Sequence, residues 1–188
     1  MDPKEFTAFL GVLERLKCTT RHSWTSTGRH ETVASHSWRL AAMAYLIRDE
    51  MPDVDFDRVL LMCLVHDFGE AVTGDIPSFL KSRADEAAEA AAVDGMLGML
   101  PAGRREALAA LFAEMDALQT PEARVFKALD KLEAVLQHNE APLSTWLPLE
   151  YELQLTYGAE EAEEFPFLKA LRGQIAADTK QKIAGGER

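Results

Sequence analysis

Apolar residues recur at helical spacing along most of the chain. Near the N-terminus, Phe6, Phe9, Val12, Leu13 and Leu16 follow the order that is typical of an amphipathic helix. Polar residues and a glycine interrupt the pattern over 19–30, which predicts an ordered loop. The same criteria predict further helices over about 32–51, 55–68, 84–99, 105–115 and 121–139, then near 150 and over about 162–180. The pattern indicates an all-α fold without strands, and we expect residues from about 181 to 188 to fray.

The run of seven apolar residues over 59–65 is apolar on every helical face, so we expect a buried central helix there. A buried strand is the alternative for so short a run. The preceding Asp55 and the continuation to about Phe68 favour the helix, because strands of that length are uncommon.

The composition indicates a single globular domain over residues 1–188, with 47% hydrophobic residues and a net charge of −11. Such an acidic surface repels phosphate backbones, so we expect no nucleic-acid or membrane partner. A small phosphate-bearing ligand needs only a local positive centre. The two cysteines, Cys18 and Cys63, form no metal or disulfide motif, and no signal peptide or membrane span is recognised, so a cytoplasmic location is expected.

Polar residues occur where the helices should be apolar. His66 and Asp67 directly follow the apolar run, Asp130 borders the apolar stripe of its helix, and His36 lies in the first turn of another. Each residue alone has an ordinary explanation, as a solvated group, a partner of a neighbouring lysine or a structural histidine. Together, two imidazoles and two carboxylates form a set that suits a divalent metal such as Mn, Fe, Co, Ni or Zn.

The order His36, His66-Asp67, Asp130 resembles the signature of the HD-domain phosphohydrolases. The segments 31–37, 66–77 and 127–133 are similar to the bacterial 5′-deoxynucleotidases and their eukaryotic HD-domain relatives, and the similarity extends over about 5–157.

This resemblance implies a helical bundle around one divalent metal ion (Mn, Co, Fe, Ni, Zn or Mg), a homodimer, and hydrolysis of nucleoside 5′-monophosphates. It assigns His36, His66, Asp67 and Asp130 as metal ligands. It also assigns Glu70 as the catalytic acid or base, Asp75 as a second active-site carboxylate and Arg21 as a phosphate contact.

One position departs from the bacterial pattern, which has tryptophan directly after the arginine. Here His22 follows Arg21, and Trp24 lies three residues after Arg21, nearer the eukaryotic arrangement. Trp24 is therefore the candidate for stacking on the base or sugar, and the choice between deoxyribose and ribose stays open.

The residues themselves leave alternatives. Glu70 lies three residues after Asp67 and so on the same face of a continued turn, but Asp75 fits an Asx-turn equally well, and Arg21 or Trp24 fits a surface charge or a core anchor. The remaining histidines, His22, His30 and His138, match no ligand position and are interpreted as structural or exposed.

Two rival functions remain. One is hydrolysis of another phosphoester, namely an alarmone, a nucleoside triphosphate or a cyclic nucleotide, although no phosphate-binding glycine loop is present. The other is a non-catalytic metal-containing binding protein on the same fold. For the homodimer, apolar faces on the predicted helices 84–99 and 105–115 are candidate interfaces.

Overall fold

The computed structural model describes residues 1–186. Helices account for most of the chain, which confirms the all-α prediction. Their bounds are α1 Pro3–Leu13, α2 Val33–Ile47, α3 Phe56–Val65, α4 Glu70–Thr73, α5 Arg83–Leu97, α6 Ala102–Ala117, α7 Pro121–Glu140, α8 Glu150–Thr156, α9 Ala159–Ala162 and α10 Pro166–Gly185. Short 3₁₀ turns follow α1, α2 and α7, at Glu14–Lys17, Arg48–Glu50 and Leu143–Thr145.

The segment 19–30 is not the loop that the sequence predicted. It contains two antiparallel strands, β1 (Thr20–Trp24) and β2 (His30–Thr32), in which Trp24 pairs with His30. Gly28 allows the connecting turn, since its φ of +78° is strained for residues with a side chain. Strands this short leave too little alternation for a periodicity argument to detect them.

The starts of the two helices that frame the site are fixed by hydroxyl caps. Thr32 precedes α2, and its side-chain oxygen accepts a hydrogen bond from the Ser35 N–H at 3.2 Å. Thr120 caps α7 in the same way through the Ala123 N–H, and Pro121 occupies the first helical position. Both starts agree with the sequence prediction, because capped N-termini have a recognisable residue pattern.

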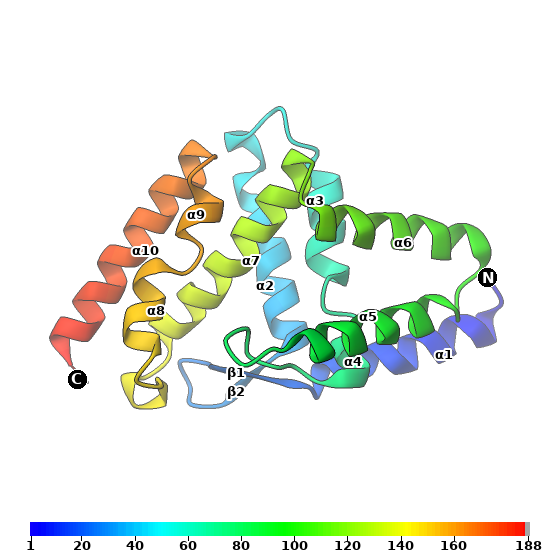
Figure 1. Ribbon diagram of the computed structural model, residues 1–188, viewed down its shortest axis with the longest axis horizontal. Helices are drawn as coiled ribbons and strands as arrows, with labels where there is room; N and C mark the ends of the chain where they lie inside the picture. The colour runs from blue at the N-terminus through cyan, green and yellow to red at the C-terminus, as the bar shows by residue number, and fades with distance from the viewer. Residues whose placement is uncertain (187–188) are drawn as a thin grey trace.

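Helix α7 lies at the centre of the molecule and packs against α2 and α3 (Figure 1). The main core, built mostly from these three helices, includes Leu40, Met62, Leu129 and Leu132, all completely buried. The prediction that residues 59–65 would be buried on every side was wrong for one face of α3. Leu61 and Leu64 are each 51% exposed.

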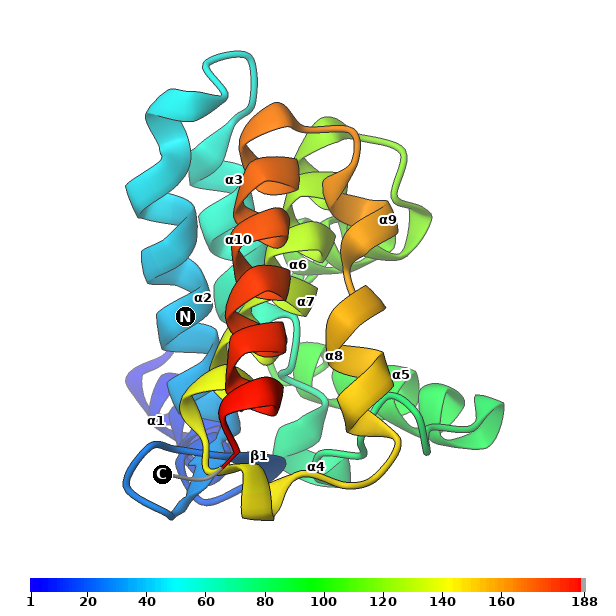
Figure 2. The same cartoon turned by 90° about the vertical axis from the view of Figure 1, so that its left-hand side faces the viewer.

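Two further groups of helices flank this centre (Figures 1 and 2). Helices α8, α9 and α10 cover one side of α7, while α1, α5 and α6 lie toward the opposite end of the longest axis. A second, smaller core near α1 and α5 includes Phe9, Leu16, Val93 and Leu97.

The predicted fraying of 181–188 was wrong over the first part of that segment, because α10 continues through Gly185; residues 187–188 lie outside the described part. Within residues 1–186, none of the helices has the length and apolarity needed to cross a lipid bilayer.

Candidate metal centre and active site

Four of the predicted site residues meet between α2, α3 and α7. His36 lies in the first turn of α2, His66 at the end of α3, Asp67 in the turn that follows it and Asp130 in the middle of α7. His36 Nε2 is 3.3 Å from Asp130 Oδ1 and 4.0 Å from Asp67 Oδ2. His66 Nε2 is 3.0 Å from Asp67 Oδ2 and 3.9 Å from Asp130 Oδ1. One nitrogen or oxygen atom of each residue therefore faces a common point.

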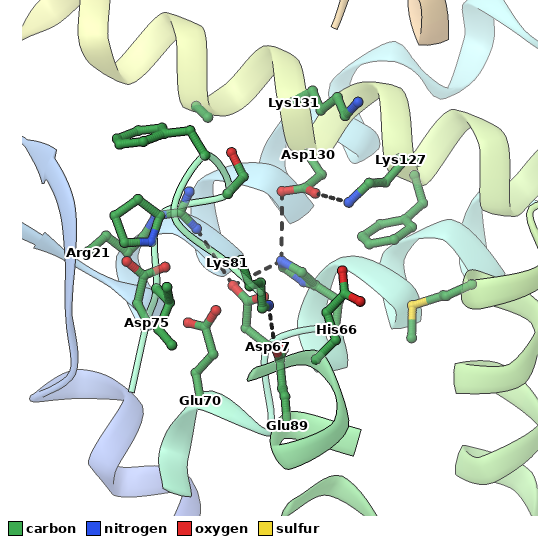
Figure 3. Close-up of a pocket in the computed structure, with 18 of the residues that line it drawn as sticks. Arg21, His66, Asp67, Glu70, Asp75, Lys81, Glu89, Lys127, Asp130 and Lys131 are labelled. Atoms are coloured by element: carbon green, nitrogen blue, oxygen red, sulfur yellow. Dashed lines mark hydrogen bonds and ion pairs between the residues drawn. The ribbon is translucent and has the colours of Figure 1, made fainter. Parts of the chain in front are cut away.

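The local structure explains why the two adjacent residues both reach this point. Helix α3 ends at Val65, and residues 66–69 form a turn before α4 begins at Glu70. In a continuous helix, neighbouring side chains would diverge by about 100°. The turn allows His66 and Asp67 to approach each other, as Figure 3 shows together with Asp130 above them.

Each imidazole is oriented by its other nitrogen. His66 Nδ1 donates to the Cys63 carbonyl oxygen at 3.0 Å, and His36 Nδ1 lies 2.5 Å from Glu133 Oε2. When such a ring is neutral, Nδ1 carries its proton and Nε2 presents a lone pair to the common point, as binding of a metal requires.

These atoms fit a divalent cation. His36 Nε2, His66 Nε2 and Asp67 Oδ2 are buried and have no hydrogen-bond partner among the described residues. An unsatisfied buried polar group costs roughly 1–3 kcal/mol, so three at one point call for a common partner. A mixed set of imidazole and carboxylate ligands is the one that transition metals and zinc accept.

The charges around the site also favour a cation. Burial and Arg21 lower the pKa of His36, but the neighbouring carboxylates of Asp130 and Glu133 outweigh them and raise it to about 10. Burial raises the pKa of Asp67, yet the two imidazoles and Arg21 prevail and lower it to about 2. The site thus holds the Asp67 carboxylate ionised and stabilises positive charge at His36.

Glu133 and Glu31 form a buried layer behind His36 that the sequence analysis did not assign. Glu133 is fully buried, Glu31 is 2% exposed, and one carboxylate oxygen of each lies within 4.8 Å of a His36 ring nitrogen. Burial and the neighbouring Glu133 raise the pKa of Glu31 to about 7. Spacing gives a usable signal for one of them, because Glu133 follows Leu129 by four residues and so shares its buried face.

A cavity of about 1110 Å³ opens beside this group of four residues. His66, Asp67 and Asp130 lie on its wall, with Arg21, Glu70 and Asp75 around them (Figure 3). The other lining residues include Lys81, Glu89, Lys127 and Phe79. The volume exceeds what a nucleotide-sized ligand requires.

Glu70, the first residue of α4, is buried and points into the same space as Asp67 and Asp75 (Figure 3). Burial, followed by the charges of those two carboxylates, raises the pKa of Glu70 to about 9. The carboxyl group is therefore protonated at neutral pH and able to donate a proton.

Arg21 and Asp75 lie on the opposite wall from Lys127. Arg21 is held by Glu31, at 3.4 Å from Nε, and by Asp67, at 3.6 Å from Nη1. Asp75 lies two residues before Pro77 and is half-buried. Burial raises the pKa of its carboxyl group, although the charge of Arg21 acts in the opposite direction. The guanidinium thus faces the cavity close to the ligand residues.

Trp24 is not brought to this site. It stacks on His30, with ring centroids 3.8 Å apart, and is not among the described residues that line the cavity. Its neighbour on the same strand, His22, does line the cavity. In a regular strand, residues 22 and 24 would share one face, but the pairing of β1 with β2 is irregular between Thr20 and Trp24. The sequence pattern revealed neither the strand nor this irregularity.

Comparison with known proteins shows similarity over most of the chain. The model of the HD domain matches residues 13–170. A 5′-deoxynucleotidase of Schizosaccharomyces pombe is 31% identical over 69% of this chain and 68% of its own length. A 5′-deoxynucleotidase of Citrobacter koseri is 28% identical over 87% of this chain and 88% of its own length.

Among solved structures, the fold is similar to a predicted metal-dependent phosphohydrolase of Magnetospirillum magnetotacticum. The TM-score is 0.79 at 26% identity, with 95% of this chain and 92% of that chain covered. The matched residues include the whole set from His36 to Asp130, and the family predicted from the sequence is confirmed: this chain belongs to the HD-domain family.

Proposed function

We propose that this HD-domain protein is a metal-dependent phosphohydrolase that removes the 5′-phosphate from nucleoside monophosphates. The observation that carries the proposal is the convergence of His36, His66, Asp67 and Asp130, with two unpartnered imidazole nitrogens, at the wall of a cavity. The similarity to proteins named 5′-deoxynucleotidases supports this substrate class.

The four residues would hold one divalent ion. Such an ion, when bound, supplies Lewis acidity that polarises a phosphoryl oxygen and makes water a better nucleophile. Its identity remains open among Mn, Co, Fe, Ni, Zn and Mg, because the ligand set suits several of these metals.

Arg21 binds the phosphate end of the substrate. Its guanidinium offers a planar pair of donors to the phosphate oxygens, and Glu31 and Asp67 fix its direction. Lys127 and Lys81 also line the cavity, but they pair with Asp130 and Glu89. The positive charge that a phosphate dianion needs would therefore come from Arg21 and the divalent ion.

Glu70 acts as the general acid. Attack of water on phosphorus breaks the bond to the 5′-oxygen, and the departing alkoxide needs a proton. The protonated carboxyl group of Glu70 lies in the cavity beside Asp67 and can supply it. Asp75 contributes as a second active-site carboxylate, since its charge helps to keep Glu70 protonated.

We assign no stacking role to Trp24 and expect His22 to form the wall near Arg21 instead. A histidine in place of a bulky indole leaves the selection of deoxyribose over ribose as a question for the substrate assay.

We also propose that the protein forms a homodimer and works in a reducing, cytoplasmic environment. Large apolar side chains are exposed on α2 and α3, where Trp38, Tyr45, Leu46, Leu61 and Leu64 are each more than half exposed. Helices α5 and α6, the interface suggested by the sequence, contribute none of the large exposed apolar residues in 1–186. Both cysteines are free thiols, as expected in a reducing compartment.

The test is phosphate release from paired deoxyribo- and ribonucleoside monophosphates after chelation and addition of single metals. We expect phosphate release only when metal is added, and only from nucleoside monophosphates. Turnover confined to an alarmone, a triphosphate or a cyclic nucleotide would support the rival hydrolase. Metal binding without turnover of any nucleotide would support a binding protein.

A further inference from the structure

A second group of metal-ligating side chains lies on the wall of the same cavity. It consists of His22 on β1, His138 near the end of α7 and Glu150 at the start of α8. Glu150 Oε1 is 3.1 Å from His22 Nε2 and 2.9 Å from His138 Nε2. The three atoms all lie within 4.8 Å of one another. None of these residues belongs to the first centre.

Two of the three side chains are oriented by their other polar atom. His138 Nδ1 donates to the Ala134 carbonyl oxygen at 2.9 Å, and Glu150 Oε2 accepts from the Leu147 N–H at 2.7 Å. A histidine that ligates a metal commonly donates its second ring N–H to a backbone carbonyl in this way. The remaining atoms, His138 Nε2 and Glu150 Oε1, form a hydrogen bond with each other at 2.9 Å.

His22 completes the group with a ring nitrogen that has no hydrogen-bond partner among the described residues. This nitrogen, Nε2, is buried, although Glu150 Oε1 is close. Glu150 is only 1% exposed. A buried ring nitrogen without a hydrogen-bond partner, next to a buried carboxylate, indicates a place for a further group that satisfies the nitrogen.

Neighbouring residues of β1 serve the two clusters separately. Arg21 contacts Asp67 at the first centre, whereas the next residue, His22, contacts Glu150. The edge of the His22 ring also meets Phe79, and the edge of the His138 ring meets Trp146, so aromatic side chains limit the movement of both imidazoles.

We propose that His22, His138 and Glu150 form a second cation site, which takes a borderline divalent ion such as Zn²⁺, Co²⁺ or Ni²⁺. Two imidazoles and one carboxylate are an established ligand set for such ions. Three protein ligands leave a coordination position open, and it faces the cavity because all three residues line it. The site does not depend on the proposed phosphohydrolase activity.

The experiment counts the ions bound to the 188-residue chain and does not rely on turnover. Chelated wild type and the variants H22Q, H138Q and H30Q are loaded with Co²⁺ or Zn²⁺, freed of unbound metal and analysed by mass spectrometry. His30 is the matched control, because it is the one of the five histidines that belongs to neither cluster. We expect H22Q and H138Q to hold one equivalent less than wild type and H30Q to match it.

Anomalous diffraction from wild-type crystals grown with Zn²⁺ needs no variant and so avoids any question of misfolding. A peak between His22, His138 and Glu150 is the expected result. Absence of that peak, or equal ion content in wild type and both variants, overturns the proposal and leaves the cluster as a polar contact between Glu150 and the two histidines.

Discussion

At the scale of single residues, the orientation of His36 depends on a carboxylate that is not part of the predicted ligand set. Glu133 is fully buried one helical turn after Asp130, and its Oε2 contacts His36 Nδ1. Partners of this kind keep a ligating ring in one tautomer and raise its basicity.

The substitution Glu133→Gln should therefore weaken binding of the divalent ion by about 10- to 100-fold, since it removes the charge behind the ring. Isothermal titration of the chelated protein measures this. Glu140→Gln is the matched control, because Glu140 also lies on α7 but is half-exposed and pairs with Arg39. Unchanged affinity in Glu133→Gln would contradict the positioning role.

Glu70→Gln should keep the ion and lose turnover. The amide cannot donate a proton to the leaving oxygen, so phosphate release should fall by about 10²- to 10⁴-fold. Asp67→Ala, in contrast, should lose both turnover and ion, because it removes a ligand atom. Ion content and phosphate release are measured on the same samples. Near-normal release by Glu70→Gln at neutral pH would be incompatible with its role as the acid.

Residues of this site could be predicted where a polar side chain occurs within or beside a run of apolar residues. His66, Asp67 and Asp130 interrupt or border apolar runs, which is visible in the sequence. The second cluster was not predictable, because His22 and His138 lie 116 positions apart in segments of mixed polarity, and only the fold brings them to one carboxylate.

At the scale of secondary-structure elements, Gly69 sets the distance between the turn that carries Asp67 and helix α5. A Cβ atom at this position would lie 2.7 Å from Glu89 Cγ, 3.1 Å from the Glu89 carbonyl oxygen and 3.2 Å from Val93 Cγ2. The backbone oxygen cannot move without shifting α5, so the position requires glycine for lack of space.

Gly69→Ala should destabilise the protein by about 1–3 kcal/mol, the usual cost of overpacking. Gly95→Ala is the control within α5, where an added Cβ meets nothing within 4 Å, and it should stabilise by about 0.4–1 kcal/mol. Urea unfolding measures both. If Gly69→Ala leaves the free energy of unfolding unchanged, α5 can move to accommodate the added Cβ atom, and the explanation is wrong.

Glu114 links three helices by polar contacts. Its carboxylate accepts hydrogen bonds from Arg58 Nε on α3, at 2.5 Å, and from the Thr120 hydroxyl that precedes α7, at 2.6 Å. The hydrogen bond from Arg58 is the main cause that lowers the pKa of Glu114 below its ordinary value.

Because the folded-state pKa is lowered, this carboxylate stabilises the protein above its unfolded pKa of about 4.3, and the contribution is lost as the pH falls. Glu114→Gln should lower the free energy of unfolding at pH 7 by only about 1 kcal/mol, because Arg58 is partly solvated. The loss should become smaller in acid, where the wild-type carboxylate is protonated as well. Thermal unfolding between pH 3 and 7 tests this, with the exposed Glu106→Gln as control. A destabilisation by Glu114→Gln that increases toward low pH would contradict the predicted pH dependence.

Elements were predictable where helical periodicity lasted for three turns or more and a cap marked the start, as for α2 and α7. The hairpin and the exposed face of α3 were not. Short strands show no clear periodicity. An apolar residue such as Leu61 does not reveal in the sequence whether it is buried in the core or exposed on the surface.

At the scale of the whole molecule, the exposed apolar face of α2 and α3 should be covered by a second copy. Leu61→Glu should shift the molecular mass in sedimentation from twice 20.9 kDa toward 20.9 kDa, because a charge would be buried at the interface. Leu10→Glu, at a 44% exposed leucine on α1, is the control and should leave the dimer intact. A monomeric wild type would refute the interface.

The central claim is that four side chains from three segments act as one centre, and Asp130→Ala tests it most directly because this residue is the most distant in sequence. Bound divalent ion and phosphate release from a nucleoside monophosphate are measured on the same folded samples of wild type and variant. The account predicts that Asp130→Ala loses one equivalent of ion and nearly all phosphate release. Retention of both by a folded Asp130→Ala protein would contradict it.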